Sequence, residues 1–459
     1  MRRAFWLTAA FAAILLALAA QQSDIRVMIQ GGARPSIAVP DLRGSGSAQP
    51  LMNAFNETLY NDLDASGLFK IVPKTMYPLQ TPQQPSDFRD QPAPQPTRPG
   101  QPPPSGGGAW LSDWSSPPVS ANYLAFGYTA VQNNVLVLYG WLFNVGQTSV
   151  SQAQVLGKRY FASPDETGAK KTAHEFAADI IAQMGGTSLL GTKIYFVSDR
   201  TGRKQKEIWV MDPDGSNQRQ ISHFNSLSIE PAVSPDGTKI AFTSFARGNP
   251  AIFILSTDTG RRLPFYNQVA SMNATPDFTP DGKQLLYAST ASGGAQIYSA
   301  NIDGSNLHRI SNTRALEVEP KVNPKTGTDV AFVSGRSGPQ QIYRMNMDGT
   351  DVQRLSNGEG EASNPSWHPN GQILAFAWTR GFATGNFNVF VMDVASRNFN
   401  QLTYGAGRNE NPSWAPDGRR LAFMSTRTGS EQIWTMLADG TQLKQLTTAG
   451  RNTTPVWAK

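Results

Sequence analysis

One phrase recurs through the second half of the chain: a proline, a short run ending in Asp-Gly or a relative of it, and then an apolar segment. It stands as "EPAVSPDGTKIAFTS" from Glu230 and as "NPSWAPDGRRLAFMS" from Asn411. The copies begin at positions 230, 275, 319, 364, 411 and 454, so the intervals are 45, 44, 45, 47 and 43 residues. This repeat constrains the fold strongly, because a unit of this size buries its apolar faces only by stacking against neighbouring units.

Each unit contains four short runs in which apolar residues alternate with small or polar ones, the pattern of β-strands. After the proline-containing run come segments such as "RLAFMS", "QIYRMNMDGT" and "VQRLS". Asp-Gly and Gly-Ser pairs between them supply hairpin turns, and the 41 glycines and 32 prolines of the chain suit a turn-rich β protein. Four short strands at a period near 45 residues predict the blade of a β-propeller.

The two ends of the repeat region complement each other. It opens at Lys193 with "KIYFVSDRTG", a second-strand phrase without its predecessor, and ends at Thr454 with "TPVWAK", a first-strand phrase without successors. We therefore predict an all-β, six-bladed β-propeller over residues 189–459, in which the C-terminal strand completes the blade begun at Lys193. The alternative is five blades with loose ends.

Two recurring features inside the blades have structural interpretations. The Asp-Gly pairs are too short a phrase for a calcium loop, which needs several oxygen ligands and a closing acid, so turns are expected; they are Asp236-Gly237, Asp281-Gly282 and Asp417-Gly418. One first-strand position carries Trp367, Trp414 and Trp457. We expect these indoles to pack between blades.

The first twenty residues have a basic start, an apolar run and a small-residue site around Ala19, which is the pattern of a cleaved secretory signal peptide. An uncleaved membrane anchor is the alternative, but the apolar run is short for a bilayer span. No other segment is apolar enough to cross a membrane, and the absence of cysteine excludes both a lipid-anchoring Cys and disulfides. We expect an exported, soluble protein.

Residues 21–188 differ from the repeats and predict a small N-terminal α/β domain. An amphipathic helix is indicated by the fourfold spacing of Leu51, Phe55, Leu59 and Leu63 before Gly67. A second helix is indicated by Ala173, Phe176, Ala177, Ile180 and Met184, with Gly185 as its terminator. The runs "RPSIAVPDL" and "FKIV" predict strands, and Asn133-Asn134 predicts the turn of a hairpin.

A proline- and glutamine-rich insertion interrupts this domain at residues 78–108. Such a composition buries too little apolar surface to order itself, so a flexible, partly polyproline segment is expected. Binding of this segment by a proline-recognising partner is the alternative.

The sequence supplies no catalytic constellation. The four histidines do not occupy equivalent positions around the ring, no G-x-S-x-G, P-loop or dinucleotide motif is present, and a thiol nucleophile is excluded. The paired acids Glu317 and Glu319 are expected to be a solvated surface pair. A formal charge of +6, or near +4 without Arg2 and Arg3, is too weak and dispersed to suggest nucleic acid. We expect no enzyme activity, no cofactor and no metal.

Polar residues recur just before each first-strand proline. Immediately before it stand Glu230, Thr275, Glu319, Asn364, Asn411 and Thr454, and two residues further back stand Ser228, Asn273, Glu317, Ala362, Asn409 and Asn452. In a propeller the first strand is innermost, and strand alternation would turn both sets toward one rim of the channel. The eleven polar residues of these sets are therefore predicted to form a partner-binding rim. Ordinary solvated loops are the alternative.

Taken together, the signal peptide, the α/β domain and the propeller resemble the TolB family, periplasmic components of the Tol–Pal system of Gram-negative bacteria. The resemblance covers essentially the whole mature chain. Its specific marks are "RPSIAVPDL", "NDLDASGLFKIV", "AHEFAADIIAQMGG" running into "TKIYFVSDRTG", and the repeats. The insertion at 78–108 is longer than expected for the family.

The resemblance implies a non-enzymatic periplasmic adaptor in protein transport, outer-membrane integrity and envelope constriction during cell division. It implies that the lipoprotein Pal binds at the channel mouth, with TolA at the mature N-terminus. Carried to this sequence, the TolA contact is expected at Asp24, Ile25, Arg26, Val27, Met28 and Ile29. Apolar residues alternate in that segment, so it could add a strand to a partner. We expect a monomer that reaches membranes only through Pal, TolA or other envelope proteins.

Two alternative functions are compatible with a secreted propeller. A secreted propeller enzyme of the peptidase or lyase kind would need catalytic side chains converging in the channel. A propeller that binds sugar or peptidoglycan would carry aromatic side chains on the rim, whereas the predicted rim is polar and non-aromatic.

Overall fold

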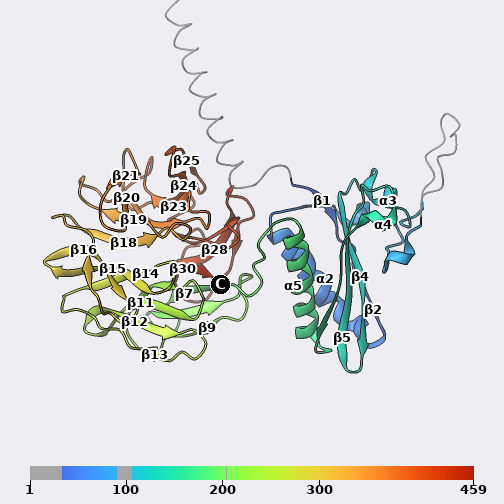
Figure 1. The fold of residues 1–459 in the computed structure, drawn as a ribbon, viewed down its shortest axis with the longest axis horizontal. Helices are drawn as coiled ribbons and strands as arrows, with labels where there is room; N and C mark the ends of the chain where they lie inside the picture. Colours follow the sequence, from blue (N-terminus) through green and yellow to red (C-terminus); the bar gives the residue numbers. More distant parts are fainter. Residues whose placement is uncertain (1–33, 90–105, 203) are drawn as a thin grey trace, which may run out of the picture. The chain divides into compact units, whose positions relative to one another are not determined.

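The computed structural model describes residues 34–89, 106–202 and 204–459. The expected signal peptide and the segment from Asp24 to Ile29 lie outside these residues. The described chain forms two compact units, residues 34–190 and residues 191–459, coloured blue to green and green to red in Figure 1. Each unit is described by itself.

In the described part of residues 191–459, six four-stranded antiparallel sheets make up the propeller. Within a blade the strands follow chain order, and the first strands of successive blades contact each other at the centre. Three blades consist of β10 (Ser228–Val233), β11 (Lys239–Arg247), β12 (Asn249–Ser256) and β13 (Arg262–Leu263); of β14 (Asn273–Phe278), β15 (Gln284–Ser292), β16 (Gly294–Asn301) and β17 (His308–Arg309); and of β18 (Glu317–Val322), β19 (Asp329–Ser334), β20 (Gln341–Asn346) and β21 (Gln353–Arg354). Two further blades consist of β22 (Ala362–Trp367), β23 (Ile373–Trp378), β24 (Asn388–Asp393) and β25 (Phe399–Gln401); and of β26 (Asn409–Trp414), β27 (Arg420–Ser425), β28 (Gln432–Leu437) and β29 (Lys444–Gln445).

The remaining blade joins the two ends of the repeat region. Its strand order is β30-β7-β8-β9, so the innermost strand is the last of the chain; the strands are β30 (Asn452–Ala458), β7 (Lys193–Ser198), β8 (Glu207–Met211) and β9 (Arg219–Gln220). β30 pairs antiparallel with β7, placing Asn452 opposite Ser198 and Trp457 opposite Ile194. The predicted closure is confirmed, and the five-bladed alternative is wrong.

The first-strand tryptophans lie between blades, as expected. Trp367, Trp414 and Trp457 are buried. The indole of Trp367 donates to the Lys321 carbonyl of the preceding blade at 2.9 Å, and that of Trp457 donates to Thr192 Oγ1 at 3.0 Å. The Trp367 hydrogen bond therefore crosses between blades, whereas that of Trp457 lies within the closing blade, between β30 and the residue ahead of β7.

The Asp-Gly pairs form turns, as predicted. Gly237, Gly282 and Gly418 all have φ near +70°, the left-handed region that glycine adopts without strain. In the first of these turns, Asp236 accepts hydrogen bonds from Ser234 Oγ and from the Thr238 amide. These bonds hold the pKa of Asp236 well below its usual range.

The N-terminal unit is a mixed sheet with strand order β3-β1-β4-β5-β6, and β2 also pairs with β4. Its strands are β1 (Ser36–Ala38), β2 (Arg43–Ser45), β3 (Lys70–Ile71), β4 (Tyr123–Gln132), β5 (Val135–Asn144) and β6 (Gln154–Ala162). Its helices are η1 (Gly46–Leu51), α2 (Met52–Ala65), η2 (Lys74–Met76), η3 (Pro85–Asp87), α3 (Leu111–Ser115), α4 (Val150–Ala153) and α5 (Glu166–Gln183).

The two predicted helices and the hairpin are confirmed. α2 buries Phe55, Leu59 and Leu63 together with side chains of α5, in one core cluster with residues of β4 and β5. α5 begins at the N-cap Asp165, whose carboxylate accepts from the Gly168 amide at 2.7 Å. Asn133 and the next residue both have positive φ, as a tight hairpin turn requires.

The flanks of the insertion contact the rest of the N-terminal unit. Phe88 is 7% exposed and packs on Phe126 and Phe143, with ring centroids 5.5 and 5.4 Å away. At the other flank, the Asp113 carboxylate accepts from the amides of Gly106 and Gly108. Phe88 and residues 106–108 are therefore held against the domain by an aromatic ring and a carboxylate, whereas Leu79 is fully exposed. Flexibility of 78–108 stays a prediction. Residues 90–105 lie outside the description.

Ring closure makes Trp457 a sensitive position. We expect Trp457→Ala to lower the free energy of unfolding of the propeller by about 3 kcal/mol, because a 6% exposed indole and its hydrogen bond are lost together. Denaturant unfolding followed by circular dichroism measures the change. The control is Leu443→Ala, which truncates a 45% exposed side chain. Equal stability of the two variants would contradict closure by β30.

Candidate binding site at the propeller channel

The residue before the first-strand proline is left-handed in each of the six blades. Pairing between the first and second strands shifts at this residue in every case, which is the signature of a β-bulge. We call these residues the collar; they are Glu230 (φ 53°), Thr275 (52°), Glu319 (53°), Asn364 (55°), Asn411 (52°) and Thr454 (44°). Asn tolerates this conformation, whereas a β-branched Thr adopts it at a cost. Each first strand thus carries one residue in a strained conformation at the channel.

Four of the six collar residues are linked to each other along the channel. Thr275 Oγ1 accepts from the Glu319 amide at 3.2 Å, and Glu319 Oε2 accepts from the Asn364 amide at 2.6 Å. Asn364 Oδ1 accepts from the Asn411 amide at 3.4 Å. At the closing blade, Thr454 Oγ1 is buried without a hydrogen-bond partner among the described residues. Hydrogen bonds therefore connect four collar residues in series, from Thr275 to Asn411.

The second predicted set does not lie on the rim. The left-handed residue breaks strand alternation, so Ser228, Asn273, Glu317, Ala362, Asn409 and Asn452 turn into the blades and are at most 2% exposed. Their predicted rim position is wrong. Glu317 pairs with Arg336 instead of forming a solvated pair with Glu319. Asn409 and Asn452 likewise accept from Arg427 and Arg200, at 3.1 and 3.0 Å.

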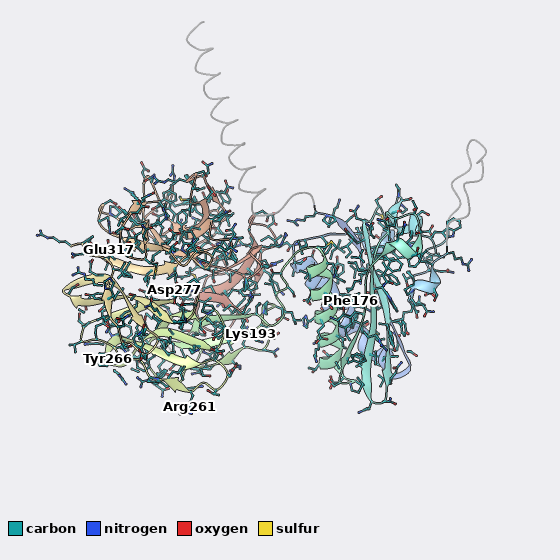
Figure 2. All side chains as sticks on the ribbon, in the orientation of Figure 1. Phe176, Lys193, Arg261, Tyr266, Asp277 and Glu317 are labelled. Carbon is teal, nitrogen blue, oxygen red and sulfur yellow. The ribbon has the colours of Figure 1, made fainter. Side chains whose placement is uncertain are left out.

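Carboxylates dominate the charge along the channel. Burial, with a smaller effect from the nearby Glu319 carboxylate, raises the pKa of Glu230 to about 7. Burial also raises the pKa of Glu319, and that of Glu410 against the opposing charge of Arg408. Asp277, labelled in Figure 2, has its pKa raised by burial although Lys321 Nζ lies 3.3 Å from its Oδ1. The channel therefore favours neutral hydrogen-bonding groups or a cation over an anion.

The described residues contain no group of three His, Asp or Glu side chains placed to hold a metal ion. Within the same ranges, no helix combines the length and apolar character that a bilayer crossing needs. The channel groups can accept and donate hydrogen bonds from several directions, which suits recognition of an inserted loop or side chain.

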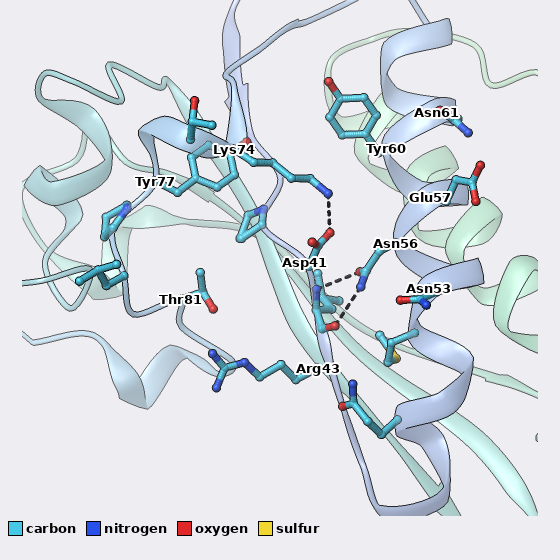
Figure 3. Close-up of a pocket in the computed structure, with 17 residues that line it drawn as sticks. Asp41, Arg43, Asn53, Asn56, Glu57, Tyr60, Asn61, Lys74, Tyr77 and Thr81 are labelled. Atoms are coloured by element: carbon cyan, nitrogen blue, oxygen red, sulfur yellow. Dashed lines mark hydrogen bonds and ion pairs between the residues drawn. The ribbon is translucent and has the colours of Figure 1, made fainter.

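A groove of about 1070 Å³ in the N-terminal unit was not anticipated from the sequence. Figure 3 shows α2 along one wall, with Asn56 reaching the backbone of Leu42. Lys74 forms an ion pair with Asp41 and lies 5.4 Å from the ring centroid of Tyr60. The polar residues within "MNAFNETLYND", the sequence of most of α2, could have indicated this groove.

The propeller half of the chain matches a known family. The family model described as "TolB beta propeller domain" matches residues 183–377 and 355–459. A "Protein TolB homolog" from Chlorobium chlorochromatii is 33% identical over 144 residues, 31% of each chain. A "Tol-Pal system protein TolB" from Roseobacter denitrificans is 30% identical over 167 residues, 35% of this chain and 36% of the relative. The matched stretches thus span about a third of these curated relatives.

The crystal structure of TolB from Acinetobacter baumannii superposes with a TM-score of 0.72 at 21% identity, covering 93% of this chain and 97% of that one. At this identity the likeness establishes the fold. Both the propeller and the smaller N-terminal unit are included in it.

The raised pKa of Glu230 gives a pH-dependent prediction. A carboxyl whose pKa rises on folding, here from 4.5 to about 7, stabilises the fold at acid pH, and this contribution is lost as pH rises through about 7. The Gln side chain of Glu230→Gln stays neutral at every pH. We therefore expect the free energy of unfolding of this variant, relative to that of the wild type, to rise by roughly 2 kcal/mol from pH 5 to pH 8. Denaturation at a series of pH values measures this. Glu359→Gln, at an exposed loop position, is the control. Parallel curves for Glu230→Gln and wild type would contradict the assignment.

Proposed function

The chain belongs to the TolB family, and on that premise we propose that it is a non-enzymatic periplasmic adaptor of the Tol–Pal system. The observation that carries this proposal is a closed propeller whose channel is encircled by a strained polar collar. Strain of this kind persists where the surrounding fold over-determines it, commonly at binding sites. The role proposed for the cell is support of outer-membrane integrity and of envelope constriction during division.

We propose the collar as the binding site for the periplasmic domain of Pal. Six collar residues bring amide, hydroxyl and carboxylate groups to one channel, where an inserted loop would meet hydrogen-bonding partners on all sides. None of the collar side chains is aromatic, which favours a protein partner over a sugar. Glu410 stands beside the collar residue Asn411, and burial raises the pKa of its carboxyl, with smaller contributions from the carboxylates of Glu431 and Glu319.

Calorimetric titration with the Pal periplasmic domain of the same organism tests the site. The variant is Glu230→Gln with Asn411→Gly, which removes a charge and an amide while glycine retains the left-handed backbone. We expect affinity to fall at least about tenfold, the effect of losing hydrogen bonds in a desolvated interface. Lys283→Ala, at the opposite end of the propeller, is the control.

Each outcome of this titration has a defined meaning. Equal affinity of the variant and wild type, with unchanged thermal unfolding, would move the Pal site away from the collar. Absence of binding by the wild type would reject the adaptor role with Pal.

We propose that TolA binds the segment Asp24 through Ile29, which lies outside the described residues. The support is the family resemblance and the alternation of Ile25, Val27 and Ile29, which suits pairing with a strand of the partner. Deleting residues 24–29 is expected to abolish binding of the TolA periplasmic domain while Pal affinity stays the same. Surface plasmon resonance with both partners measures this, and unchanged TolA affinity would reject the segment.

A further inference from the structure

Three blades fasten their first strand with an arginine from the loop after the second strand. Arg200, Arg336 and Arg427 each follow the last serine of that strand by two residues. Their guanidinium groups reach Asn452, Glu317 and Asn409, the buried residues at the start of the first strands. The Nε atoms donate to the strand-ending serines as well, at 2.9 to 3.1 Å.

The same guanidinium groups lie over an aromatic ring of the third strand. The distances to the ring centroids are 4.5 Å for Arg200 and Trp209, 5.1 Å for Arg336 and Tyr343, and 4.8 Å for Arg427 and Trp434. We call this arrangement the guanidinium seat. It consists of an aromatic ring stacked on the guanidinium plane, a serine Oγ that accepts from Nε, and a buried acceptor at the start of the first strand. This combination stabilises a planar cation by stacking and by charge-assisted hydrogen bonds.

The blade β14–β17 contains the parts of this seat without the arginine. Ala291 occupies the position of Arg427, in a loop of equal length. The backbone matches, because the Ala291 amide donates to Ser289 Oγ at 3.2 Å and the Arg427 amide to Ser425 Oγ at 3.3 Å. Tyr298 pairs with Tyr287 just as Trp434 pairs with Phe423.

Asn273 supplies the acceptor of this seat. Its side chain is 2% exposed, and its Nδ2 donates to the Gln268 carbonyl at 3.1 Å. Asn409 and Asn452 use Nδ2 in the same way, on the carbonyls of Gly407 and Ala449. Asn273 Oδ1 therefore points where Asn409 Oδ1 points, but it has no hydrogen-bond partner among the described residues.

An orphaned buried acceptor is costly, at about 1–3 kcal/mol, and the neighbouring blade avoids it. In β10–β13 the arginine position is Ala246 as well, but the residue at the start of the first strand is Ser228, which lies within hydrogen-bond distance of Ser244 Oγ. Asn273 thus retains the acceptor of the arginine-filled blades in a blade that has alanine at the arginine position.

We propose that the seat at Asn273, Ser289 and Tyr298 binds the guanidinium group of an arginine side chain presented by a protein partner. The seat lies at the channel end where first strands begin, because loops after the second and fourth strands emerge at that end. Gln268 now reaches Tyr287 from the adjoining loop and has to move aside when the arginine enters. The same loop leaves 93% of Val269 exposed.

Ligand-observed NMR with N-acetyl-arginine amide tests the seat without any partner protein. We expect saturation transfer to this probe from the wild-type chain, and none to N-acetyl-lysine amide, which lacks the planar fork. Ala291→Arg fills the seat from within, so we expect transfer to fall about tenfold while thermal stability is kept or raised. Arg427→Ala opens an equivalent seat in β26–β29 and is expected to increase transfer.

The outcomes separate the seat from its proposed use. Equal transfer in wild type and Ala291→Arg, or no transfer in the wild type, would overturn the proposal and leave an ordered water as the occupant. The identity of the partner rests on the proposed function, so Pal affinity of Ala291→Arg is measured separately. An affinity loss of about tenfold would assign the arginine to Pal; unchanged Pal affinity together with probe binding would overturn Pal as the source of the arginine.

Discussion

The propeller depends on the antiparallel pairing of its last strand with its first. β30 supplies the innermost strand of the blade that contains β7, β8 and β9, so one sheet is made from both ends of the repeat region. A single blade cannot bury its own faces, so the burial of apolar surface between blades depends on closure of the ring. Trp457 makes this dependence specific, since its indole binds Thr192 just ahead of β7.

Closure also explains the collar. The first strands converge on the channel, and each contains a left-handed bulge. In four of them, the amide of the collar residue donates to a side chain of the preceding blade. Glu319 shows both consequences, because it accepts the Asn364 amide and its buried carboxyl has a raised pKa. Ring geometry thus places strain and charge at the same site, where the proposed adaptor function needs hydrogen-bonding groups.

Much of this fold could be predicted from the sequence, because periodicity records it directly. The six blades, the closing strand and the helices around Phe55 and Phe176 all follow from spacing. The collar conformation could not be predicted by strand alternation, which assumes a regular strand, and Asn273 was misplaced for that reason. A proline after each collar residue was a signal, since it disfavours the right-handed helical region. Phe88, the one aromatic residue of the 78–108 insertion, was a similar signal that its flank is buried.

Five blades of chain separate β30 from its partner β7, which has a consequence for biosynthesis. Before residues 452–458 have been synthesised, β7 has one unpaired edge and the ring is open. A chain cleaved ahead of β30 keeps this edge exposed and is a substrate for proteases or for pairing with other open strands. Closure therefore protects the edge of β7 only in chains that contain β30.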